Sequence, residues 1–331
     1  MNTKQLLPII LITATAITAL IFMVFCSVTT QHNSLPLVAI ANYGPHFSLD
    51  ATIAGVKKEL ARQGFIEGST VNYMVCDVGF DTALIPQMIA QLKSPKPAVM
   101  VVLTTPVAQC AKGVVLDIPL VFAAVTDPVV AGLLEVAHAP SKNMTGSSEK
   151  QNLVMLLDFA RTLIPGMTRI GLLFGTGEAN DRALVAMMTA AATSVGMEVV
   201  AVPVNSARDV PIAMQQFKGA VDLIYVGSSG PIQPTLPLIA ALADQMGIPV
   251  LNVDKSAVHD GLVVGSFGVS FTQVGVNAGN LVAQLLNGSS VTQLPPVYPA
   301  VYDHTGLIHR AKAKTLGLAI PNGMPNVEVI G

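Results

Sequence analysis

The chain has 331 residues, of which 51% are hydrophobic and only 11% charged, and its formal net charge is −2 at pH 7. This length allows one large domain or two of ordinary size. The slightly negative charge and the aromatic content of 5% provide no basic face, which excludes nucleic acid as a partner. Three cysteines do not make a disulfide framework, so we expect Cys76 and Cys110 to be separate buried thiols.

The amino-terminal stretch from Leu6 to Val28 is uncharged and apolar, and it exceeds the roughly 20 residues that span a bilayer. Lys4 precedes it and no basic residue follows closely, so the positive-inside rule places the rest of the chain outside the cytoplasm. We expect residues 1–34 to be a signal sequence or membrane anchor. Cys26 stands where a lipoprotein signal has its acylated cysteine, but Phe25 replaces the small residue before it. A cleaved signal, a lipid anchor and an uncleaved anchor therefore all stay open.

Strand and helix patterns alternate from Leu37 onward, which is typical of a doubly wound parallel sheet. Strands are expected at 38–41, 70–76, 98–103 and 120–123. The helix between the first two has a stripe of Leu49, Ile53, Val56 and Leu60. After the fourth strand and Thr126-Asp127-Pro128, we expect a short apolar helix and then a turn at 143–146.

A second block of the same kind follows that turn. Its expected strands are 169–174, 198–202, 223–226, 249–253 and 263–269, with helices at about 149–163, 178–195, 208–217 and 234–246. Two such blocks predict two sheets and hence two lobes. A further helix is expected at 307–316, and residues 321–331, rich in Asn, Gly and Pro, are expected to be a loose tail.

Several motifs occur in a characteristic order along the chain. They are Gly44-Pro45-His46, GFIEGSTV from Gly64, TTPVAQ from Thr104, PLVFAAVTDPVVAGLL from Pro119, NMTG from Asn143, GEAND from Gly177 and KTLGLAIP from Lys314. In this order they resemble the substrate-binding proteins of ABC importers, in the group whose better-known members bind tryptophan and other aromatic amino acids. The resemblance covers about residues 37–321.

This resemblance implies an α/β, two-lobed, periplasmic-binding-protein-like type I fold, each lobe a doubly wound parallel sheet, with three hinge crossings between the lobes. Lobe 1 would contain residues 35–146 and 271–300, and lobe 2 residues 147–270 and 301–320. The implied protein is a monomer without enzymatic activity, cofactor or metal. It would work outside the cytoplasm, close on a small molecule and deliver that molecule to an ABC permease.

Candidate ligand contacts lie at strand ends, because ligands bind beyond the carboxyl ends of parallel strands. Tyr43 and His46 offer flat rings, and Thr104 and Thr105 begin a helix whose N–H groups suit a carboxylate. The complete set of candidates is Tyr43, His46, Thr104, Thr105, Thr126 and Asp127 in the first block and Glu178, Asn180, Ser228, Ser229, Asp254 and Phe267 in the second.

Two departures from the family concern the ligand. Ser228-Ser229-Gly230 stands where aromatic-amino-acid binders commonly have Thr-Asp-Asn, whose carboxylate meets the ligand's amine, and Phe267 stands where Tyr is frequent. An ammonium group buried without a partner is costly. Either Asp127 or Asp254 therefore meets the amine of an aromatic or branched amino acid, or the ligand has no amine.

Two other functions stay open. One is a ligand-sensing receptor subunit without transport. The other is a nucleotide-dependent enzyme using the loop Gly175-Thr176-Gly177-Glu178-Ala179-Asn180, which follows a strand and opens a helix but lacks the third glycine of a dinucleotide fingerprint. A plain helix N-cap explains the same loop.

Overall fold

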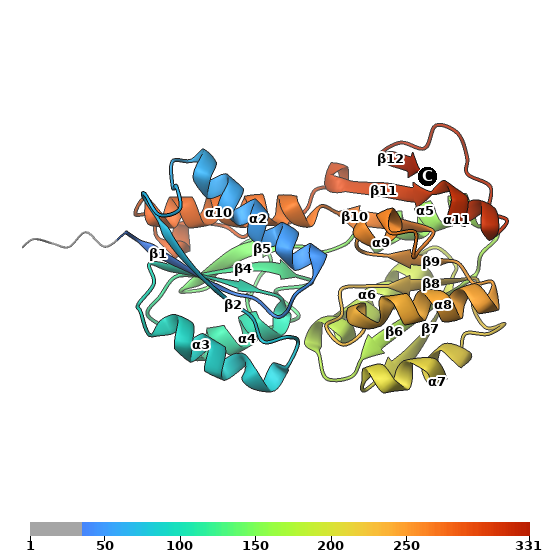
Figure 1. The fold of residues 1–331 in the computed structure, drawn as a ribbon, viewed down its shortest axis with the longest axis horizontal. Coiled ribbons are helices and arrows are strands. Elements are labelled where there is room, and N and C mark those ends of the chain that lie inside the picture. The colour runs from blue at the N-terminus through green and yellow to red at the C-terminus, as the bar shows by residue number, and fades with distance from the viewer. Residues whose placement is uncertain (1–34) are drawn as a thin grey trace, which may run out of the picture. The chain divides into compact units, whose positions relative to one another are not determined.

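The computed structural model describes residues 35–331, and residues 36–331 form one compact unit. Within this unit the chain builds two α/β lobes (Figure 1). The expected signal or anchor, with Cys26, lies outside the described residues. In the described part, no helix combines the length and the hydropathy needed to cross a bilayer.

Lobe 1 is built on a five-stranded parallel sheet in the order β2-β1-β3-β4-β5. Its strands are β1 (Leu37–Ala41), β2 (Asn72–Cys76), β3 (Val99–Leu103), β4 (Leu120–Val125) and β5 (Met144–Ser148). The helices α2 (Phe47–Arg62) and α10 (Phe271–Leu286) cover one face, and α3 (Ile85–Lys93) and α4 (Thr105–Val114) cover the other (Figure 1). Because both faces are covered, β3 and β4 are buried throughout, as their uninterrupted apolar sequences predict.

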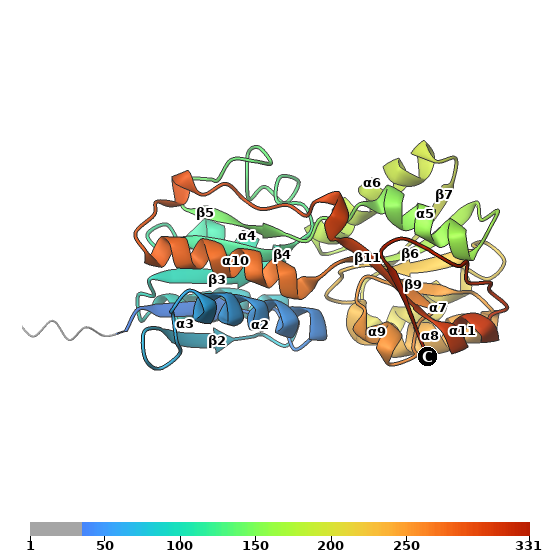
Figure 2. The same cartoon turned by 90° about the horizontal axis from the view of Figure 1, so that it is seen from above.

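Helix α10 lies beside α2, although more than 200 residues separate them in sequence (Figure 2). Glycines make this contact close: a Cβ atom on Gly55 would lie 2.3 Å from the Thr272 carbonyl oxygen, and one on Gly275 would lie 2.0 Å from the Thr52 carbonyl oxygen. Any larger residue at these positions would push the helices apart. The contact places α10 in lobe 1.

Lobe 2 is built on a seven-stranded sheet in the order β12-β11-β10-β9-β8-β6-β7. Its strands are β6 (Arg169–Gly175), β7 (Glu198–Val204), β8 (Leu223–Val226), β9 (Val250–Asn252), β10 (Gly265–Val269), β11 (His304–His309) and β12 (Val327–Ile330). Its helices are α5 (Leu153–Leu163), α6 (Ala179–Ser194), α7 (Val210–Gln215), α8 (Leu236–Met246), α9 (Ser256–His259) and α11 (Arg310–Thr315). The two-lobed α/β fold is confirmed, with one addition: β11 pairs antiparallel with β10.

Strand β5 corrects the turn expected at 143–146. Its sequence, Met-Thr-Gly-Ser-Ser, has little strand character, yet all five residues are buried. Gly146 permits the pairing with β4, because a Cβ atom there would lie 2.2 Å from the Phe122 carbonyl oxygen. The short helix expected after Asp127 is also wrong, since residues 128–132 form turns.

The carboxyl-terminal part differs from expectation as well. Residues 304–309, partly assigned to a helix from 307, form β11, because Leu307 and Ile308 are fully buried in the sheet. The tail expected to be loose contains β12, which pairs in parallel with β11. Cys76 and Cys110 are separate free thiols as expected, but each is half-buried rather than buried.

The chain crosses between the two sheets three times: from β5 to α5, from β10 to α10, and from α10 to β11. His304 joins the first and third crossings. The Asn152 N–H donates to His304 Nε2 at 2.9 Å, and Nδ1 lies 2.9 Å from the Ala300 carbonyl oxygen. These two crossings therefore lie close together, as segments of a hinge between lobes do.

Candidate ligand-binding site

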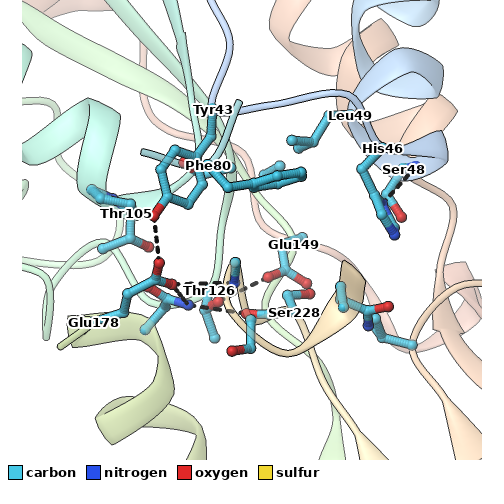
Figure 3. A pocket seen from close by; sticks show the side chains of 18 of the residues that line it. Tyr43, His46, Ser48, Leu49, Phe80, Thr105, Thr126, Glu149, Glu178 and Ser228 are labelled. Carbon is cyan, nitrogen blue, oxygen red and sulfur yellow. Dashed lines mark hydrogen bonds between the residues drawn. The ribbon is translucent and has the colours of Figure 1, made fainter. Parts of the chain in front are cut away.

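A cavity with an empty volume of about 520 Å³ lies between the lobes, beyond the carboxyl ends of β1, β3, β4, β6, β8 and β9. This volume includes space that is open to solvent. Its residues come from both lobes, so a molecule held there would contact both (Figure 3). This is the place where the strand-end rule predicts a ligand.

Nine of the residues expected from the sequence line this cavity, and three do not. The nine are Tyr43, His46, Thr104, Thr105, Thr126, Glu178, Asn180, Ser228 and Ser229. The three outside its lining are Asp127, Asp254 and Phe267. The fold thus brings together residues up to 186 positions apart in the chain, and their contact with a ligand stays a prediction.

One wall of the cavity is apolar and aromatic. The rings of Tyr43 and Phe80 meet edge to face, with centroids 5.4 Å apart. The Phe80 N–H donates to the Tyr43 carbonyl oxygen at 2.8 Å, which holds the two loops together. Leu49 and Phe271 extend the wall. Sequence reasoning missed Phe80, because it lies in a loop with no periodic pattern.

Three cavity residues other than glycine have positive φ: Phe80 at 66°, Thr104 at 74° and Ala124 at 53°. Residues other than glycine rarely adopt positive φ, because their Cβ atom makes this backbone conformation strained. Backbone strain of this kind concentrates at functional sites. Ala124 lies at an irregularity in the β4 and β5 pairing, and Thr104 precedes the first residue of α4. Positive φ thus occurs at three places in the lining of the cavity.

Three polar atoms of cavity residues are buried without a hydrogen-bond partner among the described residues: Thr104 Oγ1, Asn180 Oδ1 and Ser228 Oγ. Leaving such a group unpaired costs about 1–3 kcal/mol. A polar ligand would supply the missing partners. Thr104 stands beside the N-terminus of α4, where N–H groups without intrahelical partners favour an anion such as a carboxylate.

A hydrogen bond joins the lobes across the cavity. The Tyr43 hydroxyl donates to Glu178 Oε1 at 2.7 Å, and the Gly230 N–H donates to Glu178 Oε2 at 3.3 Å. Burial raises the pKa of Tyr43, and the Glu178 charge raises it further. A Cβ atom on Gly230 would lie 2.4 Å from Tyr43 Cε1. The lack of a side chain at Gly230 therefore makes room for this pair.

Glu178 precedes α6, but its carboxylate makes no capping bond to that helix. The next acidic residue, Asp181, accepts from the Gly175 N–H at 2.6 Å and from Ser229 Oγ at 2.8 Å. Burial, with the nearby Glu178 charge, raises the pKa of Asp181 to about 7. Carboxylates occupy the place where a dinucleotide loop would hold phosphate, so the nucleotide alternative is not favoured.

The three residues outside the cavity lining have other contacts. Asp127 accepts from the N–H groups of Val129 and Val130 at 3.1 Å and pairs with Lys150 Nζ at 2.7 Å. Burial opposes ionisation, but the bonds from Lys150 and the backbone prevail and hold the pKa of Asp127 below its usual range.

Asp254 accepts hydrogen bonds from Ser48 Oγ, in the other lobe, and from the Ser256 N–H at 2.9 Å. Its carboxylate lies 3.9 Å from His46 Nδ1. Burial lowers the pKa of His46, although the charges of Asp254 and Asp50 partly oppose this. Phe267 stacks on Phe159, with ring centroids 5.2 Å apart.

Glu149 is the carboxylate that sequence reasoning missed. It follows β5 directly, is 1% exposed and lines the cavity. Because the β5 residues were interpreted as a turn, Glu149 did not appear to lie at a strand end. Within residues 35–331, no cluster of three His, Cys, Asp or Glu side chains is arranged to hold a metal ion.

The fold and this cavity match known proteins. The chain belongs to the ABC transporter substrate binding protein family, whose model matches residues 37–326. This confirms the resemblance that the motifs indicate, and the matched family is one of binding proteins rather than enzymes.

Individual relatives agree with this assignment. A tyrosine-binding protein of Clostridioides difficile (strain R20291) is 28% identical over 258 residues, which is 78% of this chain and 74% of that protein. A conserved domain protein from Vibrio cholerae is 28% identical with a TM-score of 0.82, covering 87% of this chain and 97% of its own. The ABC domain from Streptococcus pneumonia, solved with L-Trp, has the same TM-score and coverages at 24% identity, which shows a shared fold.

Proposed function

We propose that this protein is the extracytoplasmic solute-binding component of an ABC importer and binds an aromatic amino acid in the cavity between its lobes. The observation that carries the proposal is the cavity itself. It combines an aromatic wall with buried polar atoms that have no hydrogen-bond partner within residues 35–331. Family membership and the 28% identical tyrosine-binding protein support the ligand class.

The cavity provides for each part of such a ligand. The ring would lie against Tyr43 and Phe80, where offset or edge contacts between aromatic rings add about 0.5–1.5 kcal/mol to the burial of apolar area. The carboxylate would lie at the N-terminus of α4, beside Thr104. Closure would bring Glu178 and Ser228 of lobe 2 onto the ligand from the other side.

Binding would be coupled to movement at the hinge. The hydrogen bonds from Tyr43 to Glu178 and from Ser48 to Asp254 join the lobes beside the cavity, so they exist only when the lobes are closed. A ligand that contacts both lobes stabilises this closed form. A permease that recognises the closed form would then accept only the loaded protein, and the protein would act as a monomer without cofactor.

A thermal-shift and calorimetry screen tests the ligand class. Ligand that binds only the folded state raises its stability by RT ln(1 + [L]/Kd), which is about 2.7 kcal/mol at 100 times Kd. We expect tyrosine, tryptophan or phenylalanine to raise the melting temperature clearly, and hexoses and short aliphatic acids not to do so. A shift with a sugar and none with these three amino acids would refute the proposal.

A topology experiment tests the location. If residues 1–34 direct export, a reporter fused after Ser34 is active only if it works outside the cytoplasm. A palmitate analogue should label the protein if the anchor is lipid, and Cys26→Ala should abolish that labelling. Activity of a reporter that works only in the cytoplasm would refute export.

A further inference from the structure

Glu149 occupies an unusual place in the fold. It lies at the first crossing between the lobes, its side chain reaches the cavity, and it is 1% exposed (Figure 3). Its Oε1 accepts from the Thr126 hydroxyl at 2.8 Å, and its Oε2 accepts from Gln151 Nε2 at 3.2 Å. A carboxylate has about four lone-pair positions, so these two donors leave acceptor capacity unused.

Among the described residues, no Lys, Arg or His forms an ion pair with Glu149. The cavity lining contains no Lys or Arg. The neighbouring Lys150 points to Asp127 instead, with 2.7 Å between Nζ and Oδ2. His46 is the one basic residue of the lining, and burial lowers its pKa and so favours its neutral form. A buried charge without a counter-charge is costly, so an ionised Glu149 would be stabilised by a cation beside it.

The charge state of Glu149 follows from this burial. Desolvation raises the pKa of Glu149, and the polar side chains of Thr126, Gln151 and Ser228 beside it only partly oppose this rise. A cation that entered the cavity would favour the ionised form and gain a charge-assisted hydrogen bond. The site is therefore built to gain binding energy from a positively charged group.

The other nearby carboxylates are already engaged. Asp127 pairs with Lys150 and Asp254 bonds to Ser48, and neither lines the cavity. Glu178 lines it but accepts from three donors: the Tyr43 hydroxyl, the Gly230 N–H and Asn180 Nδ2. Glu149 is the carboxylate of the lining that has fewer donors and is more deeply buried.

We propose that Glu149 binds the ammonium group of the ligand and so makes the site selective for aromatic molecules that carry a primary amine. This inference rests on the proposed function and names the group that recognises the ligand. Deaminated analogues, which would bring a second anion next to Glu149 without a cation, are then rejected.

Calorimetry with matched ligands tests the inference. Phenylalanine, tyrosine and tryptophan carry both end groups, 2-phenylethylamine carries only the amine, and 3-phenylpropionate carries only the carboxylate. The wild-type protein should bind the amino acids, and more weakly the amine, but not 3-phenylpropionate. In Glu149→Gln the affinity for the amino acids should fall roughly 10- to 150-fold, the effect of losing a hydrogen bond to a charged group, and 3-phenylpropionate should gain affinity.

Two controls separate this effect from damage to the fold. Glu198→Gln makes the same change at an exposed position at the start of β7 and should leave every affinity unchanged. Without ligand, Glu149→Gln should melt at or above the wild-type temperature, because glutamine removes a buried charge while its carbonyl oxygen still accepts from Thr126. A Glu149→Asp variant, which retains the charge, should keep the preference for amines.

The outcomes distinguish the two proposals. If the amino acids bind the wild type and Glu149→Gln with equal affinity, the inference is wrong and the proposed function stands. If amines bind through Glu149 but amino acids do not, the inference stands and the amino-acid function is wrong. If the wild type binds no ligand with an ammonium group, both are wrong.

Discussion

Replacing Asp181 with asparagine should change the unfolding free energy in a pH-dependent way. The difference between the variant and the wild type should become more favourable to the variant as pH rises from acidic to neutral. Asp181 is fully buried, and its Oδ2 accepts from the Gly175 N–H and Ser229 Oγ. The asparagine carbonyl oxygen can accept the same two bonds. The substitution therefore removes a charge and preserves the shape and the main contacts.

The size of the effect follows from the pKa of Asp181, which burial and Glu178 raise from 3.8 to about 7. Between these two values the folded state binds more protons than the unfolded state, so the wild type loses stability as pH rises. This difference in pKa between the folded and unfolded states corresponds to ~4 kcal/mol of unfolding free energy. The stability of Asp181→Asn relative to the wild type should therefore increase by up to about 4 kcal/mol from pH 4 to pH 8.

Urea denaturation between pH 4 and pH 8 measures this, followed by circular dichroism because the chain has no tryptophan. Asp222→Asn is a control of opposite sign. Burial opposes ionisation of Asp222, but the Thr168 and Arg169 N–H groups prevail and lower its pKa. That variant should lose stability relative to the wild type, and the loss should stay nearly constant from pH 8 down to pH 4, because the pKa of Asp222 lies below its ordinary value. A free-energy difference for Asp181→Asn that does not vary with pH would refute the reasoning.

Three other substitutions, one of them with a matched control, separate binding from folding. Gly230→Ala should weaken ligand binding about tenfold in calorimetry, because its Cβ atom would displace the Tyr43 ring. The control Gly177→Ala should leave affinity unchanged, because no atom lies within 4 Å of its Cβ position. Asp127→Ala should lower the unfolding free energy by ~1 kcal/mol in urea denaturation, because it removes the ion pair with Lys150. Ligand affinity should not change, since Asp127 lies outside the cavity lining. A large loss of affinity would contradict this. Thr104→Gly should raise the unfolding free energy by ~1 kcal/mol, because glycine adopts the φ of 74° without strain. It should also weaken ligand binding, because it removes Oγ1. An unfolding free energy equal to that of the wild type would mean that the backbone at Thr104 is unstrained.

Much of the candidate site could be predicted from sequence because parallel sheets place strand ends at one edge. Thr104 follows an uninterrupted apolar strand and precedes a helix, so its position was predictable from local pattern alone. Ser228 was predictable for the same reason. The resemblance to a known family added that the carboxyl ends of the strands in the two sheets face one another.

Glu149 and Asp127 illustrate why the remainder of the site was not predictable. The sequence presents Asp127 as an available carboxylate, but Lys150, 23 residues later, pairs with it. Glu149 follows β5, a strand whose small polar residues form regular structure only because β4 and the segment around Leu294 cover them. No local pattern predicts which of two carboxylates finds a cationic partner, because that choice depends on contacts between distant segments.

The sequence by itself determined the alternation of strands and helices, the two βα blocks and most strand ends, because these depend on the periodicity of apolar residues along a few turns of backbone. Periodicity did not show the return of α10 to lobe 1, which only the resemblance to a known family implied, and only the tertiary structure decided the antiparallel addition of β11 and the pairing of β12. Each depends on close approach between segments far apart in the chain, as where Gly55 and Gly275 bring α2 against α10. The same long-range packing determines which carboxylate lines the cavity without a cation beside it.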